Sequence, residues 1–314
     1  MSAPAPELSI VILSWNTREL LQRCLESLRQ VRDGVRRELL VVDNASSDGS
    51  SEMVRERFPE ARLLVNARNE GYARGNNIGI AATSGANVLL LNSDTEVRDG
   101  SLDKLVGFLR GHRAHGAVGA GLLNADGSVQ PCCMRFPTLL VPLFFDMNLD
   151  KRWPRNPVMR RYFMRDYDHR TSRDVDQPPG ACLLIRREVL EKVGVFDEEL
   201  WLYFNDVDLC KRIRRAGWLI HYLVEAPVVH HVGQSTKRFS TRVVEWHRNR
   251  LAYFRKHYGR LGAAWVRCMV RWRAWEERRR LRRELRDAGE REAALRELEG
   301  IVRDIFAPEA RRGA

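Results

Sequence analysis

Three short polar segments follow directly after apolar runs, and they hold side chains that could bind a ligand. Trp15 comes after LSIVIL, Asp43 comes directly after ELLVV, and Asp94 lies three residues after NVLLL. A carboxylate such as Asp43 can accept the ring N–H of a uracil or thymine base, and a tryptophan such as Trp15 can stack on that base. Asp94 is a hard oxygen ligand, which suits Mg²⁺ or Mn²⁺ carrying a diphosphate.

Each of these side chains also has a simpler structural interpretation. Asp43 could cap a turn, although Ser47 and Asp48 in DNASSDGS are available for that role. Trp15 could be a half-buried core aromatic residue, and Asp94 could cap a strand-to-helix turn. None of the three signals is specific when it is taken alone.

Two further segments could contribute chemistry. Asp206 opens a helical run, where the helix dipole alone favours an acidic residue, but a carboxylate there could also act as a general base. His230 and His231 are adjacent, so their side chains point in opposite directions in a strand and at most one could reach a metal. An isolated histidine of this kind is more often structural, and only a neighbouring Asp94 would favour a metal ligand.

The elements that must position these residues alternate between strand and helix. Buried strands are predicted at 8–13, 38–42, 62–65 and 87–91, with helices between them. This order predicts an α/β fold with a mostly parallel sheet, in which ligands bind beyond the carboxyl ends of the strands. Residues 131–177 are predicted to form a long irregular excursion, and the chain is predicted to be helical from residue 241 nearly to its end. We therefore expect a catalytic domain over 1–240 and a basic helical region over 241–314.

Composition excludes several classes of protein. With 44% hydrophobic and 30% charged residues, the chain is typical of a globular protein rather than a disordered one, and no apolar run is long enough to cross a membrane. The six cysteines form no CxxC pair, so neither a zinc site nor a disulfide framework is predicted, and we expect reduced thiols in the cytoplasm. The net charge of +12 is concentrated in residues 241–314, which contain 20 Lys and Arg against 11 Asp and Glu. That region should favour an anionic partner.

Six motifs in order resemble glycosyltransferase family 2, in particular its bacterial rhamnosyltransferase-like branch. They are SIVILSWN, LLVVDNASSDGS, NEGYARGNNIGI, LLLNSDTEV, PPGACLLIRREVLEKVGVFDEELWLYFNDVDLCKRIRRAGW and HHVGQST. The resemblance covers about residues 8–260. It implies the A-type nucleotide-sugar transferase fold, a Rossmann-like three-layer arrangement, together with a divalent metal and inversion at the sugar carbon.

The resemblance also implies roles for individual residues. The nucleotide sugar would be bound by Leu13, Trp15, Asp43, Arg74 and Ser93. Mg²⁺ or Mn²⁺ would be held by Asp94, which matches the final aspartate of the family's DxD motif, and by His230. Asp206 would be the catalytic base, and we expect the acceptor near Gly180, Trp201 and Asn205.

Two positions depart from the family pattern. Asn92 replaces the first aspartate of DxD, which leaves fewer charged metal ligands. Asn205 replaces the glutamate of the family's Glu-Asp pair, so any role that needs that carboxylate would be lost.

The expected activity is transfer of a sugar to a hydroxyl of a lipid-linked or polymeric glycan in bacterial cell-envelope synthesis. The donor expected from the resemblance is dTDP-L-rhamnose, with a UDP-hexose as the next choice. The basic tail predicts peripheral attachment to the anionic inner face of the cell membrane, although residues 276–300 could equally form a solvated helix or the arm of a homodimer. The alternatives are a non-catalytic nucleotide-sugar-binding protein and a basic nucleic-acid-binding protein; the tail lacks a nucleic-acid motif, so no nucleic acid is expected.

Overall fold

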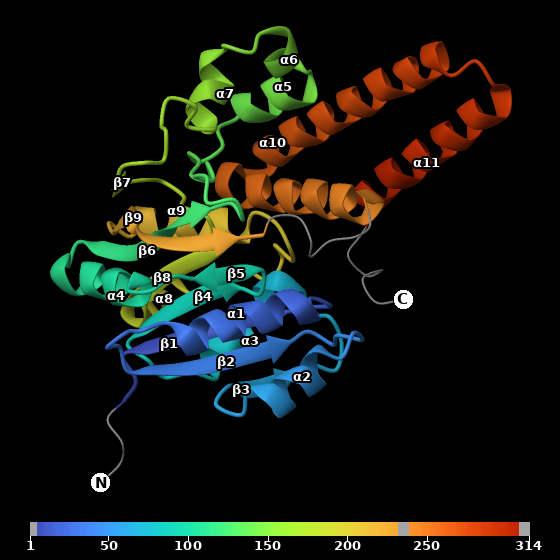
Figure 1. Ribbon diagram of the computed structural model, residues 1–314. Coiled ribbons are helices and arrows are strands. Elements are labelled where there is room, and N and C mark those ends of the chain that lie inside the picture. The colour runs from blue at the N-terminus through green and yellow to red at the C-terminus, as the bar shows by residue number, and fades with distance from the viewer. Residues whose placement is uncertain (1–4, 232–238, 308–314) are drawn as a thin grey trace. The chain divides into compact units, whose positions relative to one another are not determined.

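The computed structural model describes residues 5–231 and 239–307 and divides into two compact units (Figure 1). Within the described residues, the sheet unit comprises Met1–Phe136, Phe163–Trp201 and Asn205–Ser235. The helical unit comprises Pro137–Tyr162, Leu202–Phe204 and Thr236–Ala314. Every candidate site residue named from the sequence belongs to the sheet unit.

A mixed, mostly parallel sheet runs through the sheet unit, and nine strands of it lie in the described part of the chain. They are β1 (Leu8–Ser14), β2 (Arg37–Asp43), β3 (Arg62–Val65), β4 (Asn87–Asn92), β5 (Thr95–Val97), β6 (His115–Leu123), β7 (Arg173–Asp174), β8 (Cys182–Arg186) and β9 (Leu219–His230). The order across the sheet is β3-β2-β1-β4-β8-β6-β9-β5, and β7 pairs with β9. β1 to β4 run parallel, as do β6 and β9, while β8 is antiparallel to β4 and β6.

The register of the parallel strands brings the polar strand ends together. Ser14 at the end of β1 pairs with Asp43 at the end of β2, and Leu13 pairs with Asn92 at the end of β4. Because the carboxyl ends of parallel strands share one edge, the base-binding and metal-binding candidates lie at the same edge of the sheet. This confirms the expected α/β arrangement.

Helices cover both faces of the sheet, so this unit has three layers (Figure 1). One face packs against α1 (Arg18–Gln30), α2 (Ser50–Arg57) and α4 (Ser101–Gly111). The other packs against α3 (Gly71–Ala81), α8 (Arg187–Val193) and α9 (Asn205–Arg215). Successive side chains of a strand point to opposite faces of the sheet, so β1 contributes to a hydrophobic core on each face. Ile10 and Ile12 are buried in the first core, and Val11 is buried in the second.

The structure contains elements between residues 95 and 177 that the sequence did not predict, and the excursion over 131–177 is not irregular throughout. No individual element was predicted over 95–130, where α4 and β6 lie. The predicted irregular excursion contains three short helices, α5 (Leu140–Asp146), α6 (Leu149–Arg152) and α7 (Pro157–Tyr162). Helices of four to seven residues show too little periodicity to be recognised, and proline at the first position of a helix, as in α7, is also read as a loop signal.

The helical unit consists of α5 to α7 with α10 (Phe239–Glu284) and α11 (Ala288–Phe306), which confirms the predicted helical tail. α10 is broken at Gly259, whose φ of 72° is non-helical. A buried ion pair holds α5 to α10, with the Arg250 guanidinium 2.9 Å from Oδ2 of Asp146. Within the described residues, no helix is both long and apolar enough to cross a membrane.

Candidate functional site

Asp43 keeps one carboxylate oxygen free at the end of β2. Its side chain is buried, and Oδ2 accepts a hydrogen bond of 3.1 Å from the backbone N–H of Ser46. Oδ1 is also buried but has no hydrogen-bond partner among the described residues. A buried oxygen without a donor is unfavourable, so Asp43 is suited to accept an N–H from a bound ligand.

Trp15 lies just beyond β1 and leaves 41% of its surface exposed, so it is not part of the core. An exposed indole at this edge can stack on a planar ligand. Leu13, another candidate, is partly buried near the end of β1. It packs closely on α3, where a Cβ on Gly75 would lie only 2.5 Å from Leu13 Cδ1. Leu13 therefore requires glycine at position 75.

Asp94 and His230 meet at the ends of β4 and β9. Nε2 of His230 lies 3.4 Å from Oδ1 of Asp94. Nδ1 of His230 lies 2.9 Å from Oε1 of Gln130, an amide oxygen that can only accept, so Nδ1 carries the hydrogen. Nε2 is therefore the ring nitrogen that faces the carboxylate, and Gln130 fixes the ring in the way that an outer partner orients a metal-ligating histidine.

This donor set fits a divalent cation. Asp94 supplies a carboxylate oxygen and His230 an imidazole nitrogen, and a divalent cation could bind to both. Asp94 is buried in a tight turn between β4 and β5, and within the described residues its side chain has no polar contact other than His230. It is not the strand-to-helix cap that was the alternative.

The two adjacent histidines are turned to different acids. Nε2 of His231 lies 2.8 Å from Oε1 of Glu96, whereas His230 faces Asp94. His230 is therefore the one of the pair that we expect to hold a metal. The rest of the HHVGQST motif, residues 232–236, lies outside the described residues.

Ser93 and Arg74 have local partners. The Ser93 hydroxyl lies 2.9 Å from Oγ1 of Thr17, which links the turn after β4 to the start of α1. The Arg74 guanidinium on α3 lies 3.3 Å from a carboxylate oxygen of Glu70 and 3.5 Å from one of Glu198. Arg74 would have to leave these carboxylates in order to bind a diphosphate.

Asp206 lies in the first turn of α9 with both carboxylate oxygens hydrogen-bonded. Oδ1 accepts the backbone N–H of Val207 at 2.8 Å, and Oδ2 accepts Nε2 of Gln177 at 3.1 Å. Burial raises the pKa of Asp206, and these two hydrogen bonds oppose the rise only in part. A carboxylate with a raised pKa is a stronger base, which is the property that a general base requires.

The three predicted acceptor-site residues lie beside Asp206 or support the neighbouring segment. They are Gly180, Trp201 and Asn205. A Cβ on Gly180 would lie 3.1 Å from Oδ2 of Asp206, so a side chain at this position would crowd the carboxylate. Asn205 is buried and accepts the backbone N–H of Asp206 on Oδ1 at 2.7 Å, a positioning contact. The indole of Trp201 covers Gly71, whose φ of +81° and lack of space exclude a side chain.

Tyr72 lies between Asn92 at the end of β4 and Gly180 beside the candidate base, and sequence reasoning did not single it out. Its hydroxyl lies 3.2 Å from Oδ1 of Asn92 and 3.3 Å from the carbonyl oxygen of Gly180, and it can donate its one hydrogen to either. Burial raises the pKa of Tyr72, and the charges of Asp206 and Asp94 raise it further. One side chain thus lies within the field of both carboxylates.

Gln177 and Asn44 were also missed. Asn44 donates from Nδ2 to Asn69 and to the carbonyl of Gly71, and its Oδ1 accepts the backbone N–H of Glu70. It therefore holds the loop before α3 against the end of β2. Asn44 lies next to Asp43 in the DNASSDGS segment, so its place at the strand end could have been inferred from the sequence. Nothing in the sequence near Gln177 indicates a contact with Asp206.

The sequence comparisons identify related proteins. Residues 4–253 match the family described as Glycosyltransferase like family 2. An N-acetylglucosaminyl-diphospho-decaprenol L-rhamnosyltransferase of Mycobacterium tuberculosis is 30% identical over 277 residues, which cover 84% of this chain and 88% of that protein. A dTDP-rhamnosyl transferase of Shigella flexneri is 22% identical and matches 63% of this chain and 61% of its own length.

The structural comparison agrees in fold. A mannosyltransferase of Pyrobaculum calidifontis, solved with GDP-Man and Mn²⁺, superposes with a TM-score of 0.56 over 96% of this chain and 88% of that chain, at 16% identity. This likeness supports the A-type fold expected from the sequence motifs. With a match over most of its length, the chain belongs to glycosyltransferase family 2.

Proposed function

We propose that this protein is a metal-dependent inverting glycosyltransferase that transfers L-rhamnose from dTDP-L-rhamnose to a lipid-linked glycan acceptor in cell-envelope synthesis. The observation that carries the proposal is the Asp94–His230 pair at the edge of the sheet, together with Tyr72, on which the charges of both Asp94 and Asp206 act. Donor and acceptor are inferred from the relatives, two of which are named as rhamnosyltransferases and one of which is named for a diphospho-decaprenol acceptor.

The donor would lie along the shared strand edge. Oδ1 of Asp43 is available to accept the ring N–H of thymine, and Trp15 is exposed for stacking on the base. Asp94 and His230 would hold Mg²⁺ or Mn²⁺ beside the diphosphate. When bound, that ion would neutralise the negative charge that develops on the leaving nucleoside diphosphate.

Asp206 would take the proton of the acceptor hydroxyl. The oxygen of that hydroxyl would attack the anomeric carbon from the face opposite the leaving group, which gives inversion. Gln177 would orient the carboxylate, and Gly180 would leave space beside it. Assistance from a positioned general base is typically worth about 10² to 10⁴ in rate.

The helical unit supports attachment to a membrane surface. Most of the large apolar side chains that are exposed belong to it, namely Leu139, Leu140, Phe145, Trp153, Leu261, Trp272 and Trp275. Exposed tryptophans among arginines suit the headgroup region of an anionic leaflet. We therefore place the protein at the cytoplasmic face of the cell membrane, close to a polyprenyl-linked acceptor.

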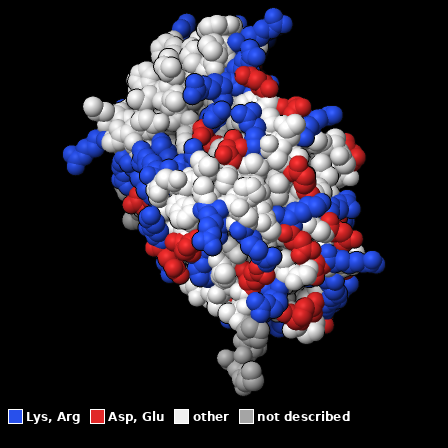
Figure 2. All heavy atoms as spheres, turned by 90° about the vertical axis from the view of Figure 1, so that its left-hand side faces the viewer, with Lys and Arg blue, Asp and Glu red and all other residues white. Residues whose placement is uncertain are grey.

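A nucleic-acid-binding role has less support. On the face in Figure 2, Lys and Arg side chains are interspersed with Asp and Glu over much of the surface and do not form one basic field. Many basic groups of the tail are also paired locally, as Arg278 is with Glu299 at 2.9 Å. A continuous basic surface is what binding along a phosphate backbone would need.

The test is a transfer assay with a prenyl-diphosphate-linked N-acetylglucosamine acceptor. dTDP-L-rhamnose and UDP-hexoses are supplied in parallel, each with Mn²⁺ and with a chelator. The proposal expects a rhamnosylated product that needs the metal and whose anomeric configuration, determined by NMR, is opposite to that of the donor. Donor binding without transfer to any acceptor would instead indicate a non-catalytic nucleotide-sugar-binding protein.

A further inference from the structure

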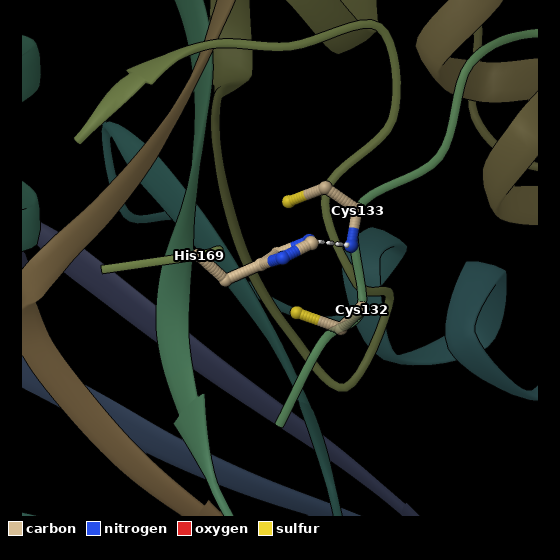
Figure 3. A group of neighbouring side chains, drawn as sticks. All are labelled: Cys132, Cys133 and His169. Atoms are coloured by element: carbon tan, nitrogen blue, oxygen red, sulfur yellow. Dashed lines mark hydrogen bonds between the residues drawn. The ribbon is translucent and has the colours of Figure 1, made fainter. Parts of the chain in front are cut away.

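Two adjacent cysteines and one histidine converge away from the candidate active residues. Cys132 and Cys133 follow β6, and His169 comes from the segment before β7 (Figure 3). Their sulfur and ring-nitrogen ligand atoms all lie within 4.8 Å of one another. Both thiols point towards the imidazole, one on either side of its tip (Figure 3). Cys133 and His169 are buried, and Cys132 is partly buried.

The histidine is held in the tautomer that a metal ligand requires. Nδ1 of His169 lies 2.9 Å from the carbonyl oxygen of Tyr167, so Nδ1 carries the hydrogen and donates it. Nε2 therefore presents a lone pair to the cluster, where it accepts the backbone N–H of Cys133 at 3.1 Å. The hydrogen bond from the far side of the ring to a carbonyl is the outer contact that ligating histidines usually have.

The backbone at His169 is also unusual. Its φ is 60°, in the left-handed region that residues other than glycine seldom adopt. Conformations of this kind persist where surrounding contacts enforce them, and they are common at ligand sites. Here the conformation turns the ring inwards between the two thiols.

Cys132 also contacts a buried tyrosine, Tyr222. Its sulfur lies 3.8 Å from the hydroxyl of Tyr222, and that hydroxyl oxygen already accepts the backbone N–H of Leu122 at 3.3 Å. The thiol of Cys132 donates to the same oxygen, which holds the sulfur in place.

We propose that Cys132, Cys133 and His169 bind one Zn²⁺ ion, with a water molecule as the fourth ligand. Two thiolates and a neutral imidazole are a donor set that Zn²⁺ takes in tetrahedral sites, at about 2.3 Å from sulfur and about 2.0 Å from nitrogen. To bind the ion, the three ligand atoms, which lie within 4.8 Å of one another, would draw closer, and Nε2 of His169 would exchange the N–H of Cys133 for the metal. Binding releases one proton from each thiol, so that two thiolates neutralise the charge of the ion.

The ion would tie together segments that are far apart in the sequence. Met134, next to Cys133, donates its backbone N–H to the carbonyl of Gln177 at 3.0 Å, and Gln177 contacts Asp206. A metal at the cysteines would therefore stabilise the strand pairing that carries Gln177. The ligands themselves do not touch Asp206, and metal binding at this site does not depend on the proposed transferase activity.

Co²⁺ titration of the reduced, metal-free full chain tests the site. A Co²⁺–thiolate bond gives a charge-transfer band in the near ultraviolet, which oxygen and nitrogen ligands do not give. We expect one equivalent of Co²⁺ to saturate this band and one equivalent of Zn²⁺ to remove it. Absence of the band in the folded, reduced protein, or a disulfide between Cys132 and Cys133 that forms in place of metal binding, would overturn the proposal.

Variants locate the site. Cys132→Ser and Cys133→Ser should each weaken Co²⁺ binding at least tenfold and reduce the band, and His169→Gln should weaken binding while both thiolates keep the band. Cys268→Ser is the matched control, because that exposed cysteine lies outside the cluster and should change nothing. A band that survives in the Cys132→Ser, Cys133→Ser double variant would place the thiolate elsewhere and refute the assignment. If a variant does not fold, the wild-type titration alone decides.

A second group of possible ligands must be distinguished. His115, Asp174 and His221 also place ligand atoms within 4.8 Å of one another. Any Co²⁺ bound there has no sulfur ligand and contributes no charge-transfer band. The variant His221→Ala should therefore leave the band unchanged, and loss of the band in this variant would contradict the cysteine site.

Discussion

Gln177 donates a hydrogen bond of 3.1 Å from Nε2 to Oδ2 of Asp206, the carboxylate proposed as the general base. Gln177 is buried, and its backbone carbonyl is held by the N–H of Met134. The side chain that touches the base is thus fixed by pairing with a different segment. This contact stabilises the charged form of Asp206 and lowers its pKa, against the larger effect of burial.

Replacing Gln177 should change the pH dependence of transfer. Gln177→Leu removes the donor, so the pKa of Asp206 should rise further, and the acid limb of kcat/KM should move to higher pH. A pH profile of kcat/KM measures this shift, and Gln22→Leu on α1, which removes an amide hydrogen bond remote from the site, is the control. An acid limb that does not move would exclude Gln177 as a partner of the base.

Asp206→Asn should reduce transfer by roughly 10² or more, with little change in donor affinity, because the lost proton acceptor acts in the transition state. Asp208→Asn is the internal control. Asp208 is fully buried and lies 2.8 Å from the guanidinium of Arg212, so its replacement should mainly reduce stability. Full turnover by Asp206→Asn with an inactive Asp208→Asn would move the base by two residues.

The variant Asp206→Asn should also be more stable than the wild type at neutral pH. Burial raises the folded pKa of Asp206 above the ordinary value of 3.8, so the stability contributed by its protonated form is present below about pH 4 and is lost as pH rises through the folded pKa. Asparagine is neutral throughout and avoids that loss. Thermal unfolding at pH 7 should show a higher Tm for Asp206→Asn, and the difference should shrink at pH 4. An equal or lower Tm at pH 7 would contradict the raised pKa.

The strands and the candidate residues at their ends could be predicted because they depend on local patterns. The runs before Trp15, Asp43 and Asp94 are apolar and bounded by polar residues, and parallel pairing places such ends at one edge. The meeting of Asp94 with His230 could be anticipated only from the family resemblance, since 135 residues separate them in the sequence. The distance between the two residues in the sequence does not predict that their side chains meet.

The remaining contacts depend on tertiary packing that a sequence pattern does not encode. Gln177 reaches the site because its backbone pairs with Met134, and Tyr72 because α3 packs against β1. Neither residue type is distinctive where it occurs. The spacing of Cys132 and Cys133 in the sequence matches no known metal-binding motif. The left-handed conformation of His169, which brings a third donor to them, could not be read from the sequence.

Metal binding should depend on Asp94 and not on its neighbour Glu96. Asp94→Asn removes the charge that faces His230, so Mn²⁺-dependent binding of the donor should be lost while the fold is retained. Glu96→Gln is the matched control two residues away, because its carboxylate pairs with His231. Donor affinity measured by calorimetry with Mn²⁺ and with a chelator separates the two variants. Unchanged metal dependence in Asp94→Asn would remove Asp94 from the metal site.

Charge reversal on α10 should weaken attachment to anionic membranes. Arg282 and Arg283 are exposed near the end of α10, close in sequence to the exposed Trp272 and Trp275. A basic residue near an anionic leaflet contributes about 1 kcal/mol, so the double change to glutamate should reduce liposome affinity by at least tenfold. Transfer to a soluble acceptor analogue should be unchanged.

The double change of Arg55 and Arg57 on α2 to glutamate, which alters the net charge equally, is the control for non-specific electrostatic attraction. If both double variants lost liposome binding equally, the helical unit would have no special role, and if neither lost any, its basic helices would serve a protein partner or a dimer.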